Sequence, residues 1–155
     1  VEAGAEAAVE AGAEAAVEVP AAPSAEELRH RGAVQVLALL QREGRLVDFL
    51  MEEVAGYTDA QIGAAARDIH RGCRKALLEH LEVVPIRPEP DEAAVRIDEG
   101  YDPSAVRLIG NIQGKPPFHG TLRHHGWRVQ RVRLPDLPPS HDPLVIAPAE
   151  VELGG

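Results

Sequence analysis

The sequence has little cysteine, few aromatic side chains and no long hydrophobic run. Cys73 is the only cysteine, which excludes an internal disulfide and a cysteine-rich zinc site. No apolar stretch approaches the length of a membrane-spanning helix, and no basic segment followed by an apolar one opens the sequence. We therefore expect a cytoplasmic protein without a secretory signal, whose core is built from Leu, Val, Ile and Ala.

Negative charge is concentrated at the beginning of the sequence. Residues 1–27 hold seven Glu and no cation, while the remaining chain is nearly neutral. The octad VEAGAEAA occurs twice, and its glycines and regularly spaced Glu disfavour a helix. Residues 1–23 are therefore predicted to form a disordered acidic tail and a proline-containing linker.

The pattern of residues 24–82 predicts about three helices. Ser24 with Glu27, and Thr58 with Gln61, have the spacing of capping boxes at two helix starts. Gly44 is a suitable end for the first helix, and a short apolar run follows it. The third helix should be the longest, because its apolar positions recur at three and four residues until about residue 81.

After residue 82 the pattern changes to short β-rich runs separated by proline and turn residues. The runs expected to form strands are Val83–Ile86, Ala94–Ile97, Ala105–Ile112, Gly120–His125, Trp127–Leu134, Val145–Ala147 and Glu150–Leu153. Short strands without helices between them are expected to pair antiparallel, so residues 83–155 should form a small barrel or curled sheet. The predicted fold class is α+β, with residues 24–155 as one compact unit.

A basic strip at residues 107–133 contains six cations and no carboxylate, in a protein of net charge −9. Its cations and aromatic side chains suit an acidic or extended protein segment, or single-stranded nucleic acid. The acidic tail argues against nucleic acid, because it would repel phosphate. The alternative is a purely structural role, in which the strip is an edge strand protected by Arg and its Trp lies in the core. The candidate binding residues are Lys115, Phe118, Arg123, His125, Trp127, Arg131 and Arg133.

Strand alternation makes a further prediction about this strip. In a regular strand, Arg131 and Arg133 would share a face with Trp127 and Val129. Apolar residues nevertheless occur at both parities between Trp127 and Leu134. This change of phase indicates a β-bulge, or a strand that is covered on both sides.

No set of residues predicts catalysis or metal binding. Cys73 lies on the apolar seam of the third helix, as a buried structural cysteine does. His124 and His125 would point to opposite faces of a strand and could not share a metal without distortion. The sequence has no nucleophile elbow and no phosphate-binding glycine loop followed by a helix. We therefore expect a non-enzymatic protein without a cofactor, and an enzyme of unrecognised type is the remaining alternative.

The first helices are apolar over much of their surface. The run Val36–Leu40 is apolar nearly all round, and a second apolar run follows Gly44. Such helices either pack against the sheet or offer a face to a partner or to a second copy of the chain.

Three strings of the sequence resemble a bacterial domain-of-unknown-function family, number 2760. They are LALLQREGRLVDFLMEEVAGYTDAQIGAAARDIHRGCRKAL (Leu37–Leu77), PPFHGTLRHHGW (Pro116–Trp127) and LVIAPAEVEL near the end. The resemblance spans about residues 28–153 and implies no known activity or catalytic residues. Members of that family are often encoded beside Hsp70-like ATPases, which implies an accessory or adaptor of an Hsp70-like chaperone. The expected function is therefore protein binding, with a nucleic-acid-binding module as the alternative.

Overall fold

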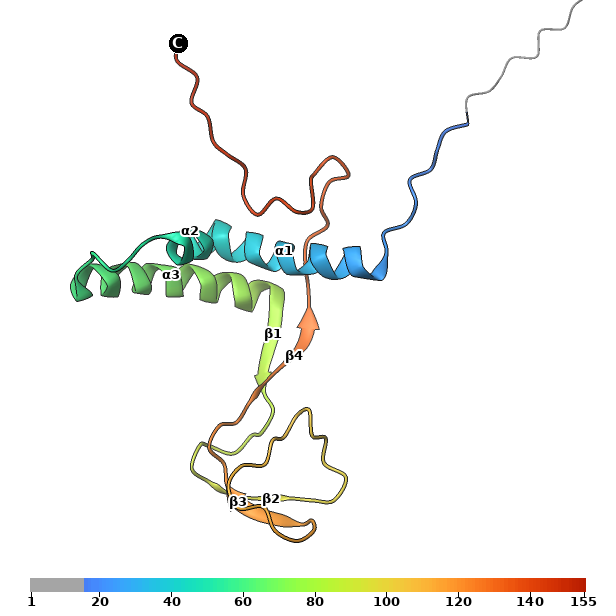
Figure 1. Ribbon diagram of the computed structural model, residues 1–155, viewed down its shortest axis with the longest axis vertical. Helices are drawn as coiled ribbons and strands as arrows, with labels where there is room; N and C mark the ends of the chain where they lie inside the picture. The colour runs from blue at the N-terminus through green and yellow to red at the C-terminus, as the bar shows by residue number, and fades with distance from the viewer. Residues whose placement is uncertain (1–15) are drawn as a thin grey trace, which may run out of the picture.

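The computed structural model describes residues 16–155, which form three helices followed by four short strands (Figure 1). The expected α+β class and the order of helices and strands are therefore confirmed. Residues 16–23 are exposed and have no helix or strand, and the rest of the predicted acidic tail lies outside the described residues. The helices are α1 (Ala25–Gly44), α2 (Leu46–Met51) and α3 (Asp59–His80). The strands are β1 (Leu81–Pro85), β2 (Ala94–Ile97), β3 (Phe118–Thr121) and β4 (Trp127–Val132).

Both long helices begin at the predicted capping boxes. The Glu27 N–H donates to the Ser24 hydroxyl at 3.2 Å, and the Ser24 N–H donates to the Glu27 carboxylate at 2.6 Å. The bond from the Ser24 N–H is the main cause that lowers the pKa of Glu27, because it stabilises the ionised carboxylate. Thr58 and Gln61 make the same reciprocal exchange at 3.2 and 2.9 Å. Each pair satisfies two backbone donors that the first helical turn leaves unpaired.

The α1 and α3 backbones approach each other very closely at two glycines. A Cβ on Gly72 would lie 2.6 Å from the Gly44 Cα and closer still to the Glu43 carbonyl oxygen. A Cβ on Gly44 would lie 2.6 Å from the backbone nitrogen of Cys73. Cys73 itself is half-buried, with its Sγ 3.8 Å from the Leu40 carbonyl oxygen, and burial raises its thiol pKa. Glycine is therefore a packing requirement at both positions.

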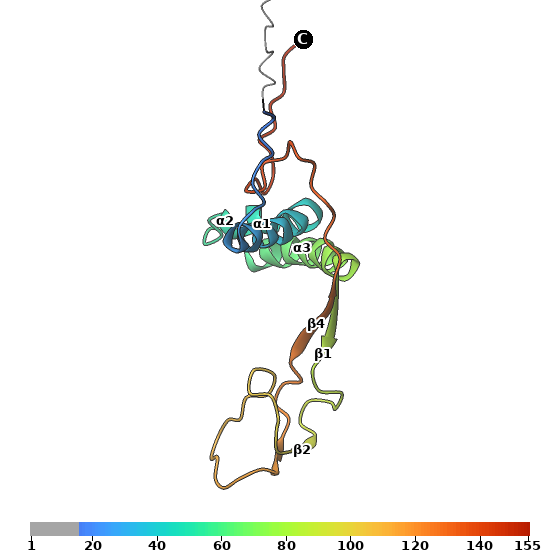
Figure 2. The same cartoon turned by 90° about the vertical axis from the view of Figure 1, so that its right-hand side faces the viewer.

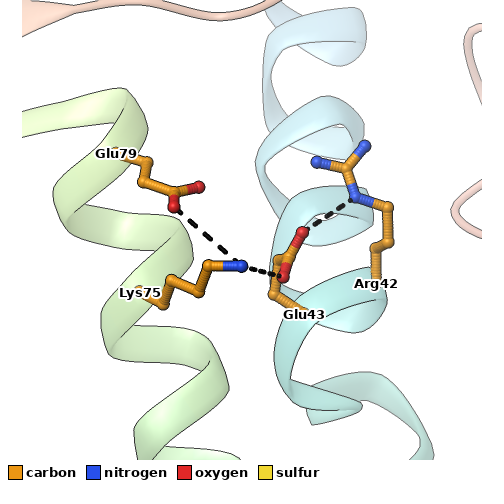
Figure 3. Close-up of polar contacts among 4 residues, drawn as sticks. All are labelled: Arg42, Glu43, Lys75 and Glu79. Atoms are coloured by element: carbon orange, nitrogen blue, oxygen red, sulfur yellow. Dashed lines mark hydrogen bonds and ion pairs between the residues drawn. The ribbon is translucent and has the colours of Figure 1, made fainter.

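A cluster of ion pairs joins α1 and α3 next to this close approach (Figure 3). The Lys75 Nζ of α3 lies 3.2 Å from the carboxylate of Glu43 on α1 and 4.0 Å from that of Glu79. Arg42 reaches the other oxygen of Glu43 at 3.3 Å. The hydrogen bond from Lys75 is the main reason that the pKa of Glu43 lies below its usual value.

The strands extend away from the helices instead of closing on them. β1 follows α3 without an intervening residue and pairs antiparallel with β4, forming a two-stranded ribbon (Figures 1 and 2). β2 and β3 pair antiparallel in a second two-stranded sheet at the far end of this ribbon. The expected barrel or curled sheet is therefore wrong. The α1 helix packs mainly on α3, so another helix and not a sheet provides most of the cover for its apolar face.

Three of the expected strands do not form. Residues 105–112 begin with a turn in which the Val106 N–H donates to the Asp102 carbonyl at 2.9 Å, and they continue as an irregular loop to Gly110 at φ 85°. The Val145–Ala147 and Glu150–Leu153 segments have no neighbouring strand and remain irregular. A strand needs a backbone partner, which its own side-chain pattern does not supply.

The ribbon contains the bulge that the sequence indicated. Glu82 lies opposite Arg131 and Val83 lies opposite Val129, so Gln130 is the extra residue of β4. Directly opposed residues share a face, which places Arg131 on the face opposite to Trp127 and Val129. The expected common face for these residues is therefore wrong, because the bulge reverses the alternation. Trp127 is 58% exposed, so its alternative placement in the core is also wrong.

The most buried part of the molecule lies between the two long helices. Leu39 of α1 and Ala76 of α3 are buried there, and Leu134 lies beside them after the end of β4. The only buried apolar residue described in the β-rich part is Ile97. No helix within residues 16–155 has the length and apolar character needed to cross a membrane.

Candidate functional site

A cleft of about 770 Å³ lies between the β2–β3 sheet and the loop that joins these strands. The sheet supplies Val95, Ile97 and Phe118, and residues 122–126 close one side. Ile97 is buried at 8% exposure, and Phe118 and Leu122 are half-buried, so part of the wall is apolar. The volume falls within the range of ordinary ligand sites.

Among residues 16–155, none of the Asp or Glu side chains lines this cleft, although the full sequence has 25 acidic residues. A group near enough to the wall would therefore meet only positive or neutral side chains, and a negative group is favoured there. The ionisable lining residues are Arg87, Arg107, Lys115, Arg123, His119, His124 and His125.

Two of these cations have no ion-pair partner among the described residues. Arg107 and Lys115 both come from the loop between β2 and β3, and both are exposed. Neither takes part in any ion pair or side-chain hydrogen bond within residues 16–155. Their charges are therefore available to a bound anion.

The other cations are held by carboxylates that do not line the cleft. Arg87 donates two hydrogen bonds to Glu89, at 3.1 and 2.6 Å, in a fork geometry. Arg123 pairs with Glu92, which takes the left-handed backbone conformation at φ 69°. These acidic partners are Glu89 and Glu92, and neither of them lines the cleft. They orient the basic groups without placing negative charge in the lining.

His125 is the most enclosed ionisable group of the wall. Its Nδ1 lies 3.2 Å from the Asp91 carboxylate, its ring stacks on His124 at 4.9 Å, and Trp127 meets it edge-on at 4.5 Å. The Nε2 atom is buried and has no hydrogen-bond partner among the described residues. The ring is therefore held by Asp91 at Nδ1, while Nε2 is enclosed on the other side of the ring.

The structure divides the predicted binding residues between two surfaces. Lys115, Phe118, Arg123 and His125 line the cleft. Trp127, Arg131 and Arg133 belong to the ribbon or follow it, and none of them lines the cleft.

The ribbon residues have their own contacts. Arg131 lies 3.6 Å from the Glu82 carboxylate across the ribbon. The Arg133 N–H donates to the His80 carbonyl at 2.7 Å, and the His80 Nδ1 lies 3.0 Å from the Arg133 carbonyl. The strip that is continuous in sequence is therefore not one continuous groove.

Sequence reasoning missed four ionisable residues of the lining, which are Arg87, Arg107, His119 and His124. A usable signal was present for three of them, because they lie in the acid-free strip. Arg87 lies outside it, and only strand pairing brings it near, through the bond from its N–H to the His125 carbonyl at 3.0 Å. Within residues 16–155, no group of three or more His, Cys, Asp or Glu side chains is arranged to hold a metal ion.

A family model described as Domain of unknown function (DUF2760) matches residues 15–152. The chain belongs to this family. The resemblance seen in three strings of the sequence is thereby confirmed, and the match includes every helix and strand of the structure. No curated protein and no solved structure matches this DUF2760 chain.

Proposed function

We propose that this DUF2760 protein is a non-enzymatic interaction module that binds an acidic segment of a partner protein in the cleft. The observation that carries the proposal is the acid-free lining, in which Arg107 and Lys115 have no ion-pair partner among residues 16–155. Carboxylates of a bound segment would complete these two charges. Attraction between opposite charges favours such binding most at low salt, where it is screened least.

The apolar part of the lining supports a peptide over a simple ion. Phe118, Leu122 and Val95 offer a surface that an inorganic anion would not use. A segment in which acidic residues flank one Leu or Phe would place its apolar side chain against this surface. Its flanking carboxylates would then lie toward Arg107 and Lys115.

The charges outside the cleft support a protein over a nucleic acid. Glu89, Asp91 and Glu92 lie beside the basic lining residues, and the exposed Asp98 and Glu99 begin the loop that carries Arg107. A long polyanion that passed through the cleft would meet these carboxylates on leaving it. An acidic segment of limited length avoids them. An Hsp70-like ATPase, which the family resemblance implies as a neighbour, is the first partner to test.

The direct test is fluorescence anisotropy with the full chain and a short labelled peptide of Glu residues around one Leu. A peptide with Gln in place of every Glu is the ligand control. We expect the acidic peptide to bind with an affinity that falls as salt rises. The Arg107→Ser/Lys115→Ser double variant should weaken binding at least about tenfold, since it removes both available charges.

Arg74→Ser is the matched protein control, because Arg74 is an exposed cation of α3 outside the cleft. Equal loss in this control, or equal binding of the Gln peptide, would contradict the proposal. A single-stranded oligonucleotide that binds more tightly, with a steep salt slope, would favour the nucleic-acid alternative. Retention of an Hsp70-like ATPase by the native chain, and not by the double variant, would identify the partner class.

A further inference from the structure

The outer edge of β4 in the ribbon has backbone N–H and C=O groups that could pair with another strand. In the part of the chain that the structure describes, the β1–β4 sheet has two strands, and every residue of β4 is exposed. Outside the ladder with β1, none of the described backbone hydrogen bonds involves residues 127–132. A two-stranded sheet is marginally stable in water, and an unpaired edge is a template for a further strand.

The bulge gives this edge two chemically distinct faces. Trp127, Val129 and Val132 lie opposite Pro85, Val83 and Leu81, so they share one apolar face. Arg128 and Arg131 lie opposite Val84 and Glu82 on the other face. Along the edge, the order is therefore apolar, basic, apolar, basic, apolar, with Gln130 as the bulged residue. A complementary strand would alternate apolar and acidic side chains.

The segment Ala149–Leu153 of this chain has that complementary pattern. Its sequence, AEVEL, alternates three apolar residues with Glu150 and Glu152. The two Glu are two residues apart, about 7 Å in a strand. Arg128 and Arg131 have the same spacing, because their partners on β1 are also two residues apart. The match holds whichever way the added strand runs.

This segment is exposed and makes no polar contact with the described residues of its own chain. Residues 147–155, the arm, are all exposed, with Val151 at 78% and Leu153 at 86%. None of the hydrogen bonds or ion pairs of the described residues involves the arm. The arm leaves the helices on the side opposite to the ribbon (Figures 1 and 2). Its apolar and acidic side chains therefore face solvent while their complements on β4 do the same.

We propose that two copies of this chain exchange their arms, each adding residues 149–153 to the β4 edge of the other. Each ribbon then becomes a three-stranded sheet, and the arrangement is a closed two-fold dimer. The apolar residues of the arm cover the face of Trp127 and Val129, while Glu150 and Glu152 meet Arg128 and Arg131. The β1 edge is a poorer acceptor, because Pro85 has no N–H and Glu82 would repel the arm. The proposal does not depend on the function of the cleft.

The experiment is analytical ultracentrifugation of the full chain over a range of concentrations, with Trp127 fluorescence recorded in parallel. We expect a reversible monomer–dimer equilibrium, with a blue shift of the Trp127 emission as the dimer forms. The arm variant, Glu150→Arg/Glu152→Arg, and the ribbon variant, Arg128→Glu/Arg131→Glu, should each weaken self-association at least about tenfold. Val17→Asp/Val19→Asp is the control. Both valines are about as exposed as Val151 and Leu153 of the arm, and they lie in another irregular segment.

Mixing the two variants is the decisive step. The basic arm of one chain then meets the acidic ribbon of the other, and the acidic arm meets the basic ribbon. We expect a heterodimer to form at concentrations at which neither variant alone self-associates appreciably. A native chain that remains monomeric at every concentration overturns the proposal, as does a dimer that both charge variants leave intact. A mixture that stays monomeric overturns it too.

Discussion

The two ends of this molecule are stabilised in different ways. Between α1 and α3, the backbones touch at Gly44 and Gly72, and an ion pair joins Glu43 to Lys75. In the ribbon and the cleft, Ile97 is the one buried apolar residue described, and β4 is exposed throughout. The helices are held together by close backbone packing, whereas most side chains of the β-rich part are exposed or half-buried.

The largest loss of stability in this comparison should come from Gly72→Ala. The added methyl group meets backbone atoms of Glu43 and Gly44, which cannot rotate away, so α1 and α3 must separate. We expect the free energy of unfolding to fall by about 3 kcal/mol, measured by urea titration with circular dichroism.

Gly63→Ala is the matched control, because a Cβ at that position of α3 would have no atom within 4 Å. Its higher helix propensity should raise stability by up to about 1 kcal/mol. Equal destabilisation by both changes would show that the two helices do not require this close approach.

The next largest effect should come from Ile97→Ala at the base of the cleft. Removing a buried Ile side chain is expected to cost about 2 kcal/mol. Because the β2–β3 sheet lies at the far end of the ribbon from the helices (Figure 1), the loss should appear mainly in the unfolding transition reported by Trp127 fluorescence, and less in the helical signal at 222 nm. Ile109→Ala, at a 67% exposed isoleucine of the same region, should have little effect. Identical shifts of both signals would mean that the two ends unfold as a single unit.

A smaller effect is expected at the start of α1. Ser24→Ala removes the hydroxyl that accepts from the Glu27 N–H and should lower stability by about 1 kcal/mol. The loss should appear in the helical signal at 222 nm, since the cap belongs to α1 alone. Ser140→Ala, in an irregular segment without a described hydrogen bond, should not change it. No difference between the two variants would mean that the cap does not stabilise the helix.

The smallest effect, and one that depends on pH, should come from Lys75→Met. Glu43 has a lowered pKa in the folded protein, so its stabilising contribution is present above the unfolded carboxyl pKa. That contribution is lost as the pH falls through the folded value. The variant should therefore melt slightly below the native protein at neutral pH, and the difference should shrink in acid. Arg71→Met, whose ion pair with Asp68 stays within α3, is the control. A difference that is constant with pH would exclude the Glu43 carboxylate as its source.

Features that depend on neighbouring residues could be predicted from the sequence. Both capping boxes and the end of α1 at Gly44 follow from signals within four residues, and the structure contains all three. The bulge also had a local signal, because apolar residues occur at both parities of β4. Its position could not be deduced, since only pairing with β1 identifies Gln130 as the extra residue.

Features that depend on distant pairing could not be predicted. Whether short strands close into a barrel depends on which edges meet, and here β1 meets β4 across more than 40 residues. The same non-local pairing divided the basic strip. Lys115 and Arg123 went to the cleft, while Arg131 went to the ribbon, because the chain turns back into the β1 ladder at Gly126. The close approach at Gly72 was missed for a similar reason, since a helical glycine does not show which backbone will touch it.

The cleft is formed entirely by an excursion of the chain whose two ends meet. The Ile86 N–H donates to the Gly126 carbonyl at 3.2 Å, so the chain leaves and rejoins the ribbon at the same level. Residues 87–125 are therefore an insertion at the tip of the β1–β4 hairpin. A tight two-residue turn could replace them and leave the helices, the ribbon and the arm connected as before. Exchange of residues 87–125 would thus change the lining of the cleft without changing the packing of α1 on α3.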